Sequence, residues 1–374
     1  MSLVFLCGPL CHRPLLAAIL GPDLAEALSF DPASARGQAA HLVDAPGACA
    51  LRPCPGAQVD GALVAMPPEA AARLAFYARA LGLVRRRLQA RTAQGRHPAI
   101  AYSLPAAESA GAPPWDADLW RADHAALAVE TATEVMGAMG HLSPARVQAR
   151  LGPLMVRAAS RLRARTGPAP HALRRAPDTI VVHARRQPYA QFFAVEEYDL
   201  SFRRFDGRMS PVVTRAAFIS GDAVTVLPYD PIRDRVLLVE QMRVAPFVRG
   251  DRHPWQLEAI AGRIDPGETP EAAARREAVE ESGLTLGALL PVANTYPSPG
   301  AKTEFLYSYV ALTDLPDGSA GVFGVAHEAE DIRGHLIGLD QALALVDSGE
   351  IATAPLVLTL FWLHRERARL KAQG

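Results

Sequence analysis

Cysteine is scarce in this sequence, and all four of its cysteines lie within the first 54 positions. That is far from the cysteine density of a disulfide-stapled secreted domain, so a reducing cytoplasm is the expected compartment. No apolar run is long enough to span a bilayer, and the start, MSLVFLCGPLCHRP, has no basic segment ahead of its apolar run. We therefore expect neither a signal peptide nor a membrane partner. The formal net charge is zero, which gives no general attraction to nucleic acid or anionic membranes.

The cysteines admit one alternative, a zinc site built from Cys7, Cys11, His12, Cys49 and Cys54. Three residues separate the first two cysteines and four separate the last two, whereas regular zinc motifs use tighter spacings. Cys7 also lies in an apolar, strand-like run, where a small buried thiol is common. We therefore favour packing over metal binding.

Three regions differ in pattern along the 374 residues, a length that suggests two or more domains. Residues 1–110 alternate short apolar runs with Gly/Pro turns, which predicts strands, with one helix at PPEAAARLAFYARAL. Residues 111–177 are expected to form a helical connector that ends in a linker, TGPAPHALRRAPD. Residues 178–374 are expected to begin with strands and a hairpin at AVTVLPYDPIRDRVLLVEQMR. The charged helix, the strand EFLYSYVAL and a helical tail from about Gly338 follow.

Six arginines lie between Arg157 and Arg175. A basic cluster of this kind can bind nucleic acid, but no aromatic residues are interleaved with it to stack on bases. A solvated helix face that runs into a linker is the simpler interpretation, so no nucleic-acid partner is expected.

The stretch GRIDPGETPEAAARREAVEESGL has an unusual charge distribution. Thr269 suits the N-cap, Pro270 the first helical position and Gly283 the C-terminal stop, which together predict a helix. Yet Glu280 and Glu281 occupy its last turn, where the helix macrodipole favours cations.

A divalent cation would explain these carboxylates. Glu277 and Glu281 stand four apart on one helix face, a like-charge pair that weakens an isolated helix. Magnesium, which prefers oxygen ligands, would neutralise them, and the preceding loop could add the carbonyl of Ala261. Arg276 could pair with Glu268 and pin the loop to the helix. The simpler alternative is an ordinary surface helix with mixed charges.

Eight positions of this stretch follow a fixed spacing: Gly262, Glu268, Arg276, Glu277, Glu280, Glu281, Gly283 and Leu284. The spacing resembles the Nudix box, the loop–helix motif of hydrolases that act on nucleoside diphosphates linked to another moiety. The resemblance implies an α+β fold for the C-terminal region, the α-β-α sandwich of the Nudix family.

The resemblance covers about residues 178–370 and extends beyond the box. The segment SPG places Pro299 fifteen residues after Leu284, and the stretches VEQMRVAP and SPGAKTE also resemble ADP-ribose pyrophosphatases of the tellurite-resistance-associated type. Membership of that branch implies hydrolysis of ADP-ribose to AMP and ribose 5-phosphate with two or three Mg²⁺ ions, or with Mn²⁺. Tellurite resistance is a phenotype label, and no residue here indicates tellurium chemistry.

The resemblance also implies roles for individual residues. The expected metal ligands are the Ala261 carbonyl, Glu277, Glu280, Glu281 and Glu330, and Glu328 in the loop HEAED would help Glu277 and Glu281 in catalysis by activating the attacking water. The expected substrate-binding residues are Arg243 and Arg215 for the diphosphate, Phe192 for adenine, Glu304 for the terminal ribose, and Ser298 beside the proline.

Each role has a structural alternative. Phe192, next to Phe193, could be a core residue, and Arg215 could be an ordinary surface residue. The loop acids could be solvated charge, although polar loops often carry catalysis. Relatives in the branch are homodimers that exchange N-terminal strands, so a homodimer through the Nudix domain is expected.

Residues 1–110 resemble the gamma-glutamylcyclotransferase-like family, through VFLCGPLCH and GALVAMPPEAAARLAFYARALG. The resemblance implies a small mixed β-barrel with helices. Pro9 removes an amide donor from the loop that binds substrate in that family, and Ala78 replaces the expected general acid/base glutamate. We therefore expect this domain to be inactive, although Glu69 could substitute for the missing carboxylate.

Three alternatives to an ADP-ribose pyrophosphatase stay open. The first is a Nudix enzyme for another nucleoside diphosphate sugar, such as GDP-mannose. The second is a nucleotide-binding regulator without turnover, and the third is a working cyclotransferase in the first domain.

Overall fold

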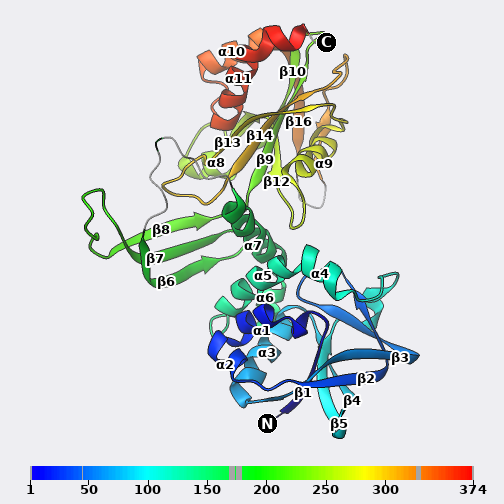
Figure 1. Ribbon diagram of the computed structural model, residues 1–374. Coiled ribbons are helices and arrows are strands. Elements are labelled where there is room, and N and C mark those ends of the chain that lie inside the picture. Colours follow the sequence, from blue (N-terminus) through cyan, green and yellow to red (C-terminus); the bar gives the residue numbers. More distant parts are fainter. Residues whose placement is uncertain (1, 44, 168–172, 174–178, 326–329, 373–374) are drawn as a thin grey trace. The chain divides into compact units, whose positions relative to one another are not determined.

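The chain forms two compact units, Met1–Pro170 and His171–Gly374. The computed structural model describes residues 2–43, 45–167, 173, 179–325 and 330–372 (Figure 1). Each unit encloses hydrophobic cores of its own. The predicted boundaries at residues 110 and 177 stay a prediction.

The first unit is built on a closed five-stranded barrel. Its strands follow one another around the barrel in the order β1 (Ser2–Cys7), β3 (Cys49–Met66), β2 (Asp31–Leu42), β4 (Val84–Thr92) and β5 (Gly95–Ser103). All neighbouring pairs are antiparallel except β1 and β5, which close the barrel in parallel. The small mixed barrel that we expected is therefore present, but a barrel alone does not identify the cyclotransferase-like family.

Strand β1 separates two cores. Its successive side chains point to opposite faces, so Phe5 and Cys7 lie inside the barrel while Val4 and Leu6 face the helices. Cys49 is also buried in the barrel, whereas Cys11 and Cys54 are exposed.

Helices cover the outer side of β1. They are η1 (Gly8–Cys11), α1 (Arg13–Leu20), α2 (Pro22–Glu26), α3 (Pro68–Ala80), η2 (Ala106–Ser109), α4 (Ala117–Asp123), α5 (Ala125–Gly137), α6 (Pro144–Gln148) and α7 (Leu151–Thr166). The sequence predicted α3 and the helices between α4 and α7, but not α1 or α2. Those two are short and have a proline in their first turn, Pro14 and Pro22, in a region where Gly/Pro turns were expected.

The helical connector packs within the first unit. Helix α5 lies against α1 and α7, and α3 lies against α6. Glu134 of α5 is buried and accepts hydrogen bonds from Arg157 (3.3 Å) and Arg161 of α7. A buried carboxylate requires such partners, so this ion cluster joins the two helices.

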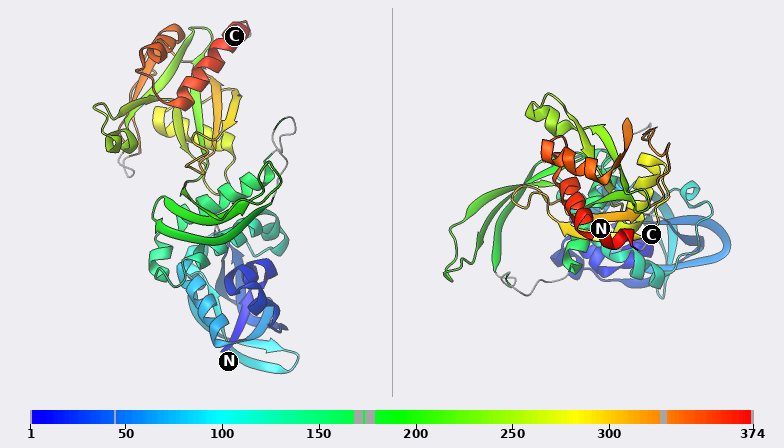
Figure 2. Two further views of the ribbon diagram at one scale, coloured as in Figure 1. Left: turned by 90° about the vertical axis from the view of Figure 1, so that its left-hand side faces the viewer. Right: turned by 90° about the horizontal axis from the view of Figure 1, so that it is seen from above.

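The second unit contains two sheets. A three-stranded antiparallel sheet consists of β6 (Ile180–Ala190), β7 (Ala194–Phe202) and β8 (Val213–Ile219), visible as a curved ribbon in Figure 2. The larger sheet has the order β13 (Leu289–Thr295), β14 (Leu306–Leu312), β9 (Ala223–Asp230), β10 (Arg235–Met242), β16 (Ile332–Gly338) and β15 (Val322–Phe323). Strand β11 (Trp255–Glu258) pairs with β10, and β12 (Ile260–Arg263) pairs with β9.

Helices cover both faces of this larger sheet (Figure 1). They are α9 (Pro270–Ser282) on one face, and α10 (Leu339–Ser348) and α11 (Ala354–Lys371) on the other. The short helix α8 (Val244–Arg249), which follows β10, buries no residue. In β10, Leu237 and Val239 pack in the core under α9, while Val236 and Leu238 pack in the core under α10 and α11. The predicted α-β-α sandwich, the β9–β10 hairpin and the helical tail are thus confirmed.

Among the described residues, no helix is long and apolar enough to cross a membrane.

Candidate active site

The charged helix α9 has the ends that its sequence predicts. The Thr269 hydroxyl caps it by accepting the Ala272 N–H (3.1 Å), and Pro270 is its first residue. Gly283 ends it with φ of 66°, a left-handed conformation in which glycine carries no steric penalty. The N-cap, start and stop are therefore confirmed.

Arg276 fastens the loop before α9 to the helix. Its guanidinium donates to both carboxylate oxygens of Glu268, at 3.1 and 3.0 Å, and to the carbonyl of Arg263 at 2.9 Å. This bidentate geometry fixes the loop in position more firmly than a single contact could. The predicted Arg276–Glu268 pair is confirmed.

Glu281 is the most buried carboxylate of the helix, with 2% of the residue exposed. One oxygen accepts the backbone N–H of Ala261 (3.1 Å), and the other accepts the side-chain amide of Gln241 (3.4 Å). Burial raises the pKa of Glu281 from its ordinary 4.5 to about 8, although the Ala261 hydrogen bond opposes the shift. The nearby charge of Glu277 raises this pKa further, and that of Arg243 lowers it.

Glu277 lies beside Glu281 and is also partly buried. Burial raises its pKa from 4.5 to about 7, and the charges of Glu280 and Glu330 act in the same direction. Arg276 donates to Glu277 at 2.7 Å and opposes the shift. Burial therefore outweighs the nearby arginines and keeps the pKa values of both neighbouring carboxyls raised.

Gly262 makes the space that Glu277 occupies. A Cβ atom at position 262 would lie 1.8 Å from Oε1 of Glu277, far inside van der Waals contact. Only glycine therefore allows the β12 backbone and the Glu277 carboxylate to approach each other this closely.

Ala261 also faces the carboxylates. It lies opposite Thr225 in the β9–β12 ladder, but its N–H does not point toward that strand and donates to Glu281 instead. In an antiparallel ladder the N–H and C=O of one residue point the same way, so the Ala261 carbonyl lies on the side of Glu281 as well.

The two remaining expected ligands lie at the rim. Glu280 accepts a hydrogen bond from Arg276 at 3.0 Å, and Glu330 accepts the N–H of Val325 at 3.2 Å. Glu330 is close enough to Glu277 to raise its pKa. Glu328, which we expected to activate water, lies outside the described residues.

In the part of the chain that the structure describes, no group of three or more His, Cys, Asp or Glu side chains is arranged to hold a metal ion. Arg276 is hydrogen-bonded to Glu277 and Glu280 at once.

Arg243 lies next to the carboxylates. It precedes α8, and its Nε donates to Glu258 at 2.6 Å. Its charge reaches Glu281, whose pKa it lowers. The structure therefore places one expected phosphate-binding arginine beside the acidic cluster.

Phe192 lies in the turn between β6 and β7 and is 61% exposed. Its ring meets that of Phe193 edge to face at 4.8 Å, and Phe193 in turn packs on Phe218 at 4.7 Å. The guanidinium of Arg263 covers the Phe192 ring at 3.7 Å from its centroid. Phe192 is thus not a core residue. Its ring contacts the guanidinium of Arg263, the residue that follows Gly262.

The segment that holds Ser298 and Glu304 is attached to β8. Phe218 donates its N–H to the carbonyl of Ala301 at 2.8 Å, and the Ser298 carbonyl accepts the Lys302 N–H at 2.9 Å. Lys302 lies 3.9 Å from the Glu304 carboxylate. Through Phe218 and Phe193, this segment is connected to Phe192.

Arg215 lies apart from this group. It is exposed on β8, the last strand of the small sheet, and donates to the carbonyl of its neighbour Thr214 at 2.9 Å. None of its described contacts joins it to the acidic cluster.

The structure thus brings together Ala261, Glu277, Glu280, Glu281, Glu330 and Arg243, and separately Phe192, Ser298 and Glu304. It also adds Gln241, Glu258 and Arg263, which we did not predict. Gln241 lies two residues before Arg243, near the end of one strand, so a period of two could have indicated it. The contacts of Arg263 and Glu258 join distant segments, which local patterns cannot indicate.

Known proteins resemble the second unit. Residues 220–356 match the NUDIX domain family. A protein of Escherichia coli (strain K12) named ADP-ribose pyrophosphatase is 40% identical over 192 residues, 51% of this chain and 91% of that protein. A protein of Citrobacter koseri named GDP-mannose pyrophosphatase is 36% identical over 150 residues, 40% of this chain and 77% of that protein. A crystal structure described as an ADP compounds hydrolase is 22% identical with a TM-score of 0.41, over 54% of this chain and 99% of that chain.

The α-β-α sandwich and the acidic helix α9 indicate a class of enzymes whose site is formed by carboxylates on a loop and a helix. With the matches just described, the chain belongs to the Nudix family, and its second unit is a Nudix diphosphatase.

Proposed function

We propose that the second unit hydrolyses ADP-ribose to AMP and ribose 5-phosphate in a reaction that needs Mg²⁺. The observation that carries the proposal is the pair of neighbouring carboxylates Glu281 and Glu277. Glu281 is buried and accepts the Ala261 N–H, and the partly buried Glu277 occupies the space left by Gly262. The ADP-ribose pyrophosphatase of Escherichia coli, with 40% identity over nearly its whole length, supports the substrate.

The residues present suit a divalent cation. Carboxylate and carbonyl oxygens are the ligands that Mg²⁺ and Mn²⁺ prefer. A cation would offset the burial and the mutual repulsion that raise the pKa values of Glu277 and Glu281. We assign Glu277, Glu281, Glu280, Glu330 and the Ala261 carbonyl as the residues that would hold two or three such ions. Arg276 would then keep its hydrogen bonds to Glu268 and lose those to Glu277 and Glu280 on α9.

The bound cation would withdraw charge from the diphosphate and lower the pKa of a water molecule. Arg243 contributes a second positive charge for the phosphate oxygens, in the planar form that suits them. Glu258 holds the Arg243 side chain in place through its Nε. By resemblance, Glu328 would accept the proton of the attacking water, while AMP or ribose 5-phosphate leaves with the bridging oxygen.

The base and the distal ribose would bind on the side of Phe192. The exposed Phe192 ring offers a surface for adenine, and the segment from Ser298 to Glu304 offers polar groups for the ribose. Arg215 lies on the small sheet, apart from the acidic cluster. Its proposed contact with the diphosphate would therefore be made in the site of a second protomer.

A second candidate substrate is GDP-mannose. The GDP-mannose pyrophosphatase of Citrobacter koseri matches 36% over 77% of its length, and the carboxylates of α9 serve any nucleoside diphosphate linked to a sugar. The two substrates differ in base and sugar, so the residues around Phe192 and Glu304 would decide between them. A nucleotide-binding regulator without turnover is the third candidate.

The direct test measures products from ADP-ribose, GDP-mannose and ADP-glucose with the purified full chain and Mg²⁺. We expect AMP and ribose 5-phosphate from ADP-ribose, at a kcat/KM at least tenfold above that for GDP-mannose. Glu281→Gln should lower kcat at least 100-fold, while Glu350→Gln, an exposed glutamate outside the site, should leave it unchanged. Faster turnover of GDP-mannose would make GDP-mannose the substrate in place of ADP-ribose. No turnover of any of the three would favour the nucleotide-binding regulator.

We also propose a homodimer formed by the second unit. The small sheet exposes many large apolar side chains, which monomeric surfaces seldom gather in one place. Ile180, Val181, Val182 and Tyr189 lie on β6 and Phe202 on β7, while Met209 and Val212 lie in the connection between β7 and β8. A partner's copy of this sheet would cover them and could supply Arg215 to the site.

The first unit remains, by resemblance, a gamma-glutamylcyclotransferase-like domain without turnover, in a cytoplasmic protein. Ala78 is buried in α3, and its methyl group has no proton to exchange, so it cannot serve as the general acid/base. Glu69, the alternative, is exposed in the first turn of α3. The association of similar proteins with tellurite resistance rests on the resemblance alone.

A further inference from the structure

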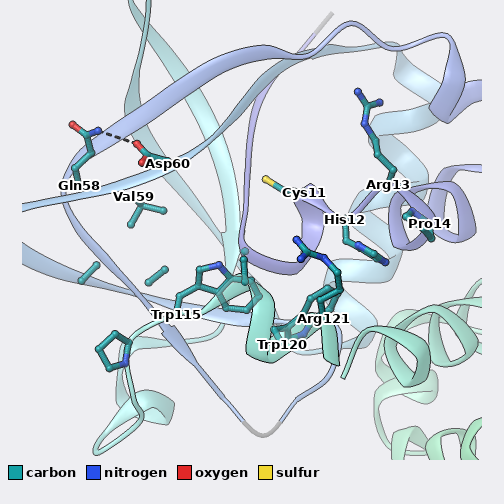
Figure 3. A pocket seen from close by; sticks show the side chains of 15 residues that line it. Cys11, His12, Arg13, Pro14, Gln58, Val59, Asp60, Trp115, Trp120 and Arg121 are labelled. Atoms are coloured by element: carbon teal, nitrogen blue, oxygen red, sulfur yellow. Dashed lines mark hydrogen bonds between the residues drawn. The ribbon is translucent and has the colours of Figure 1, made fainter. Parts of the chain in front are cut away.

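The first unit contains a cavity of about 750 Å³, a volume typical of small-molecule sites. Three segments form its walls: the η1 helix and the start of α1, the strands β2 and β3, and the segment Pro114–Arg121. Figure 3 shows Trp115, Trp120 and Arg121 on one side of the cavity and Gln58 and Asp60 on the opposite side. The Pro114–Arg121 wall lies beyond residues 1–110, so the cyclotransferase-like resemblance does not account for it.

One wall is aromatic. The rings of Trp115 and Trp120 lie 5.7 Å apart, and His12 meets Trp120 edge to face at 5.3 Å. Trp120 is 2% exposed, and its Nε1 donates to the Pro46 carbonyl at 2.8 Å, so this ring is fixed. Trp115 is only half-buried and presents apolar surface to the cavity. A flat ligand ring would find a preformed surface here.

The cavity has an excess of positive charge. Its lining contains the guanidinium groups of Arg13 and Arg121 and one carboxylate, Asp60. Arg13 lies over the Phe30 ring at 3.3 Å, and Arg121 pairs with Asp118 of its own helix at 2.5 Å. That second pair is largely exposed and therefore weak, so Arg121 can exchange Asp118 for a ligand anion.

The lining suits binding better than catalysis. Its one carboxylate, Asp60, accepts the Gln58 amide at 2.8 Å. The Cys11 thiol donates to the Leu6 carbonyl at 3.2 Å. Although the residue is partly open to solvent, desolvation of the sulfur by surrounding protein raises its pKa to about 12, so it is not a thiolate at neutral pH. Burial and the charge of Arg121 lower the pKa of His12, which leaves the two arginines as the cations.

We propose that this cavity binds a small organic anion that carries a flat ring. The ring lies against Trp115, and a carboxylate or phosphate group pairs with Arg121, while Arg13 adds positive charge to the lining. The opposite wall, with Gln58 and Asp60, accepts a hydrogen bond from a donor on the far end of the ligand. This site is independent of the diphosphatase activity, because every residue that forms it belongs to the first unit.

Isothermal titration calorimetry of the full chain tests the proposal with four probes. Phenyl phosphate and 4-aminobenzoate combine a ring with an anion, benzamide has a ring without charge, and inorganic phosphate is an anion without a ring. We expect saturable binding of at least one charged ring, at least tenfold tighter than that of benzamide or phosphate. The tighter of the two charged rings identifies phosphate or carboxylate as the preferred anion.

Substitutions then locate the bound probe. Arg121→Gln and Trp115→Ala should each weaken it about tenfold or more, while Arg96→Gln, an exposed arginine on β5, should have no effect. Arg121 is exposed, so Arg121→Gln should unfold at the same temperature as the parent chain. The proposal is wrong if no charged ring binds below millimolar concentration, if benzamide binds equally well, or if both cavity substitutions leave binding unchanged.

Discussion

Gly262 is the residue on which the position of Glu277 depends most closely. Its backbone and the Glu277 carboxylate share a space in which a Cβ atom would lie 1.8 Å from Oε1. The clash involves the end of a side chain, so the chain can fold around a larger residue only by moving the carboxylate.

We therefore expect Gly262→Ala to remain folded but to lose about 100-fold in kcat/KM for the proposed substrate, because a displacement of about 1 Å at a reacting site costs that much. Thermal unfolding and steady-state kinetics measure the two effects. Gly338→Ala is the matched control, since a Cβ there meets nothing within 4 Å. Full activity in Gly262→Ala would show that Glu277 is not needed at its present position.

Glu281 makes the stability of the second unit depend on pH. Its pKa in the folded chain is about 8, against 4.5 ordinarily. Between these values the unfolded chain has lost the proton while the folded chain retains it. The unfolded state therefore binds fewer protons, and the free energy of unfolding falls as pH rises through this window.

In EDTA, we expect this free energy to fall by on the order of 3 kcal/mol between pH 5 and pH 8. Glu281→Gln should remove most of the slope and leave a smaller part that comes from Glu277. Mg²⁺ should reduce the slope in the parent chain, since it selects the deprotonated carboxylates. Chemical denaturation at several pH values measures how the free energy of unfolding depends on pH. Equal pH dependence in the parent chain and in Glu281→Gln would contradict the burial of the Glu281 carboxyl.

At the scale of elements, α9 shows what its sequence could and could not predict. Its cap, its first residue and its stop depend on neighbours within a few positions, so Thr269, Pro270 and Gly283 were predictable. The same holds for the Arg276–Glu268 pair, which a short loop brings together. The clustering of carboxylates indicated a site because it contradicts the helix macrodipole.

The rest of the site depends on contacts between distant segments. Gln241 reaches Glu281 from 40 positions away, and Arg263 covers Phe192 across 71. No local period records such pairs, since they follow from how sheets and loops pack. For the same reason the sequence missed α1 and α2, whose short lengths and prolines suggested turns. Packing of α1 against α5, and of α2 against α1, stabilises them instead.

Arg276 joins the loop and α9, and lysine should not replace it. The guanidinium reaches Glu268, Glu277, Glu280 and the Arg263 carbonyl together, whereas an ammonium group lacks the planar fork. We expect Arg276→Lys to destabilise the second unit by about 1–3 kcal/mol and to lower kcat/KM at least tenfold. Denaturation and kinetics test this, with the exposed Arg365→Lys as control. An unchanged unfolding midpoint would mean that the loop holds its position without Arg276.

At the scale of the whole molecule, the open question is how the exposed small sheet is covered. Ile180 and Val182 of β6 are 65% and 53% exposed, and apolar residues on its neighbours extend the surface. Each exposed strand of this kind favours association with another copy. The proposed homodimer would bury this face and bring Arg215 of one protomer to the site of its partner.

The full chain should therefore sediment at twice its mass of 40.0 kDa. Ile180→Lys combined with Val182→Lys should raise the dimer dissociation constant at least tenfold, since two charges would have to be desolvated at the interface. If the partner completes the site, kcat/KM should fall together with the dimer fraction as the enzyme is diluted. Ile232→Lys, at an apolar residue that is 75% exposed in the β9–β10 turn, is the matched control. A monomer with full activity would place all the required residues within one chain, and Arg215 would then be an ordinary surface residue.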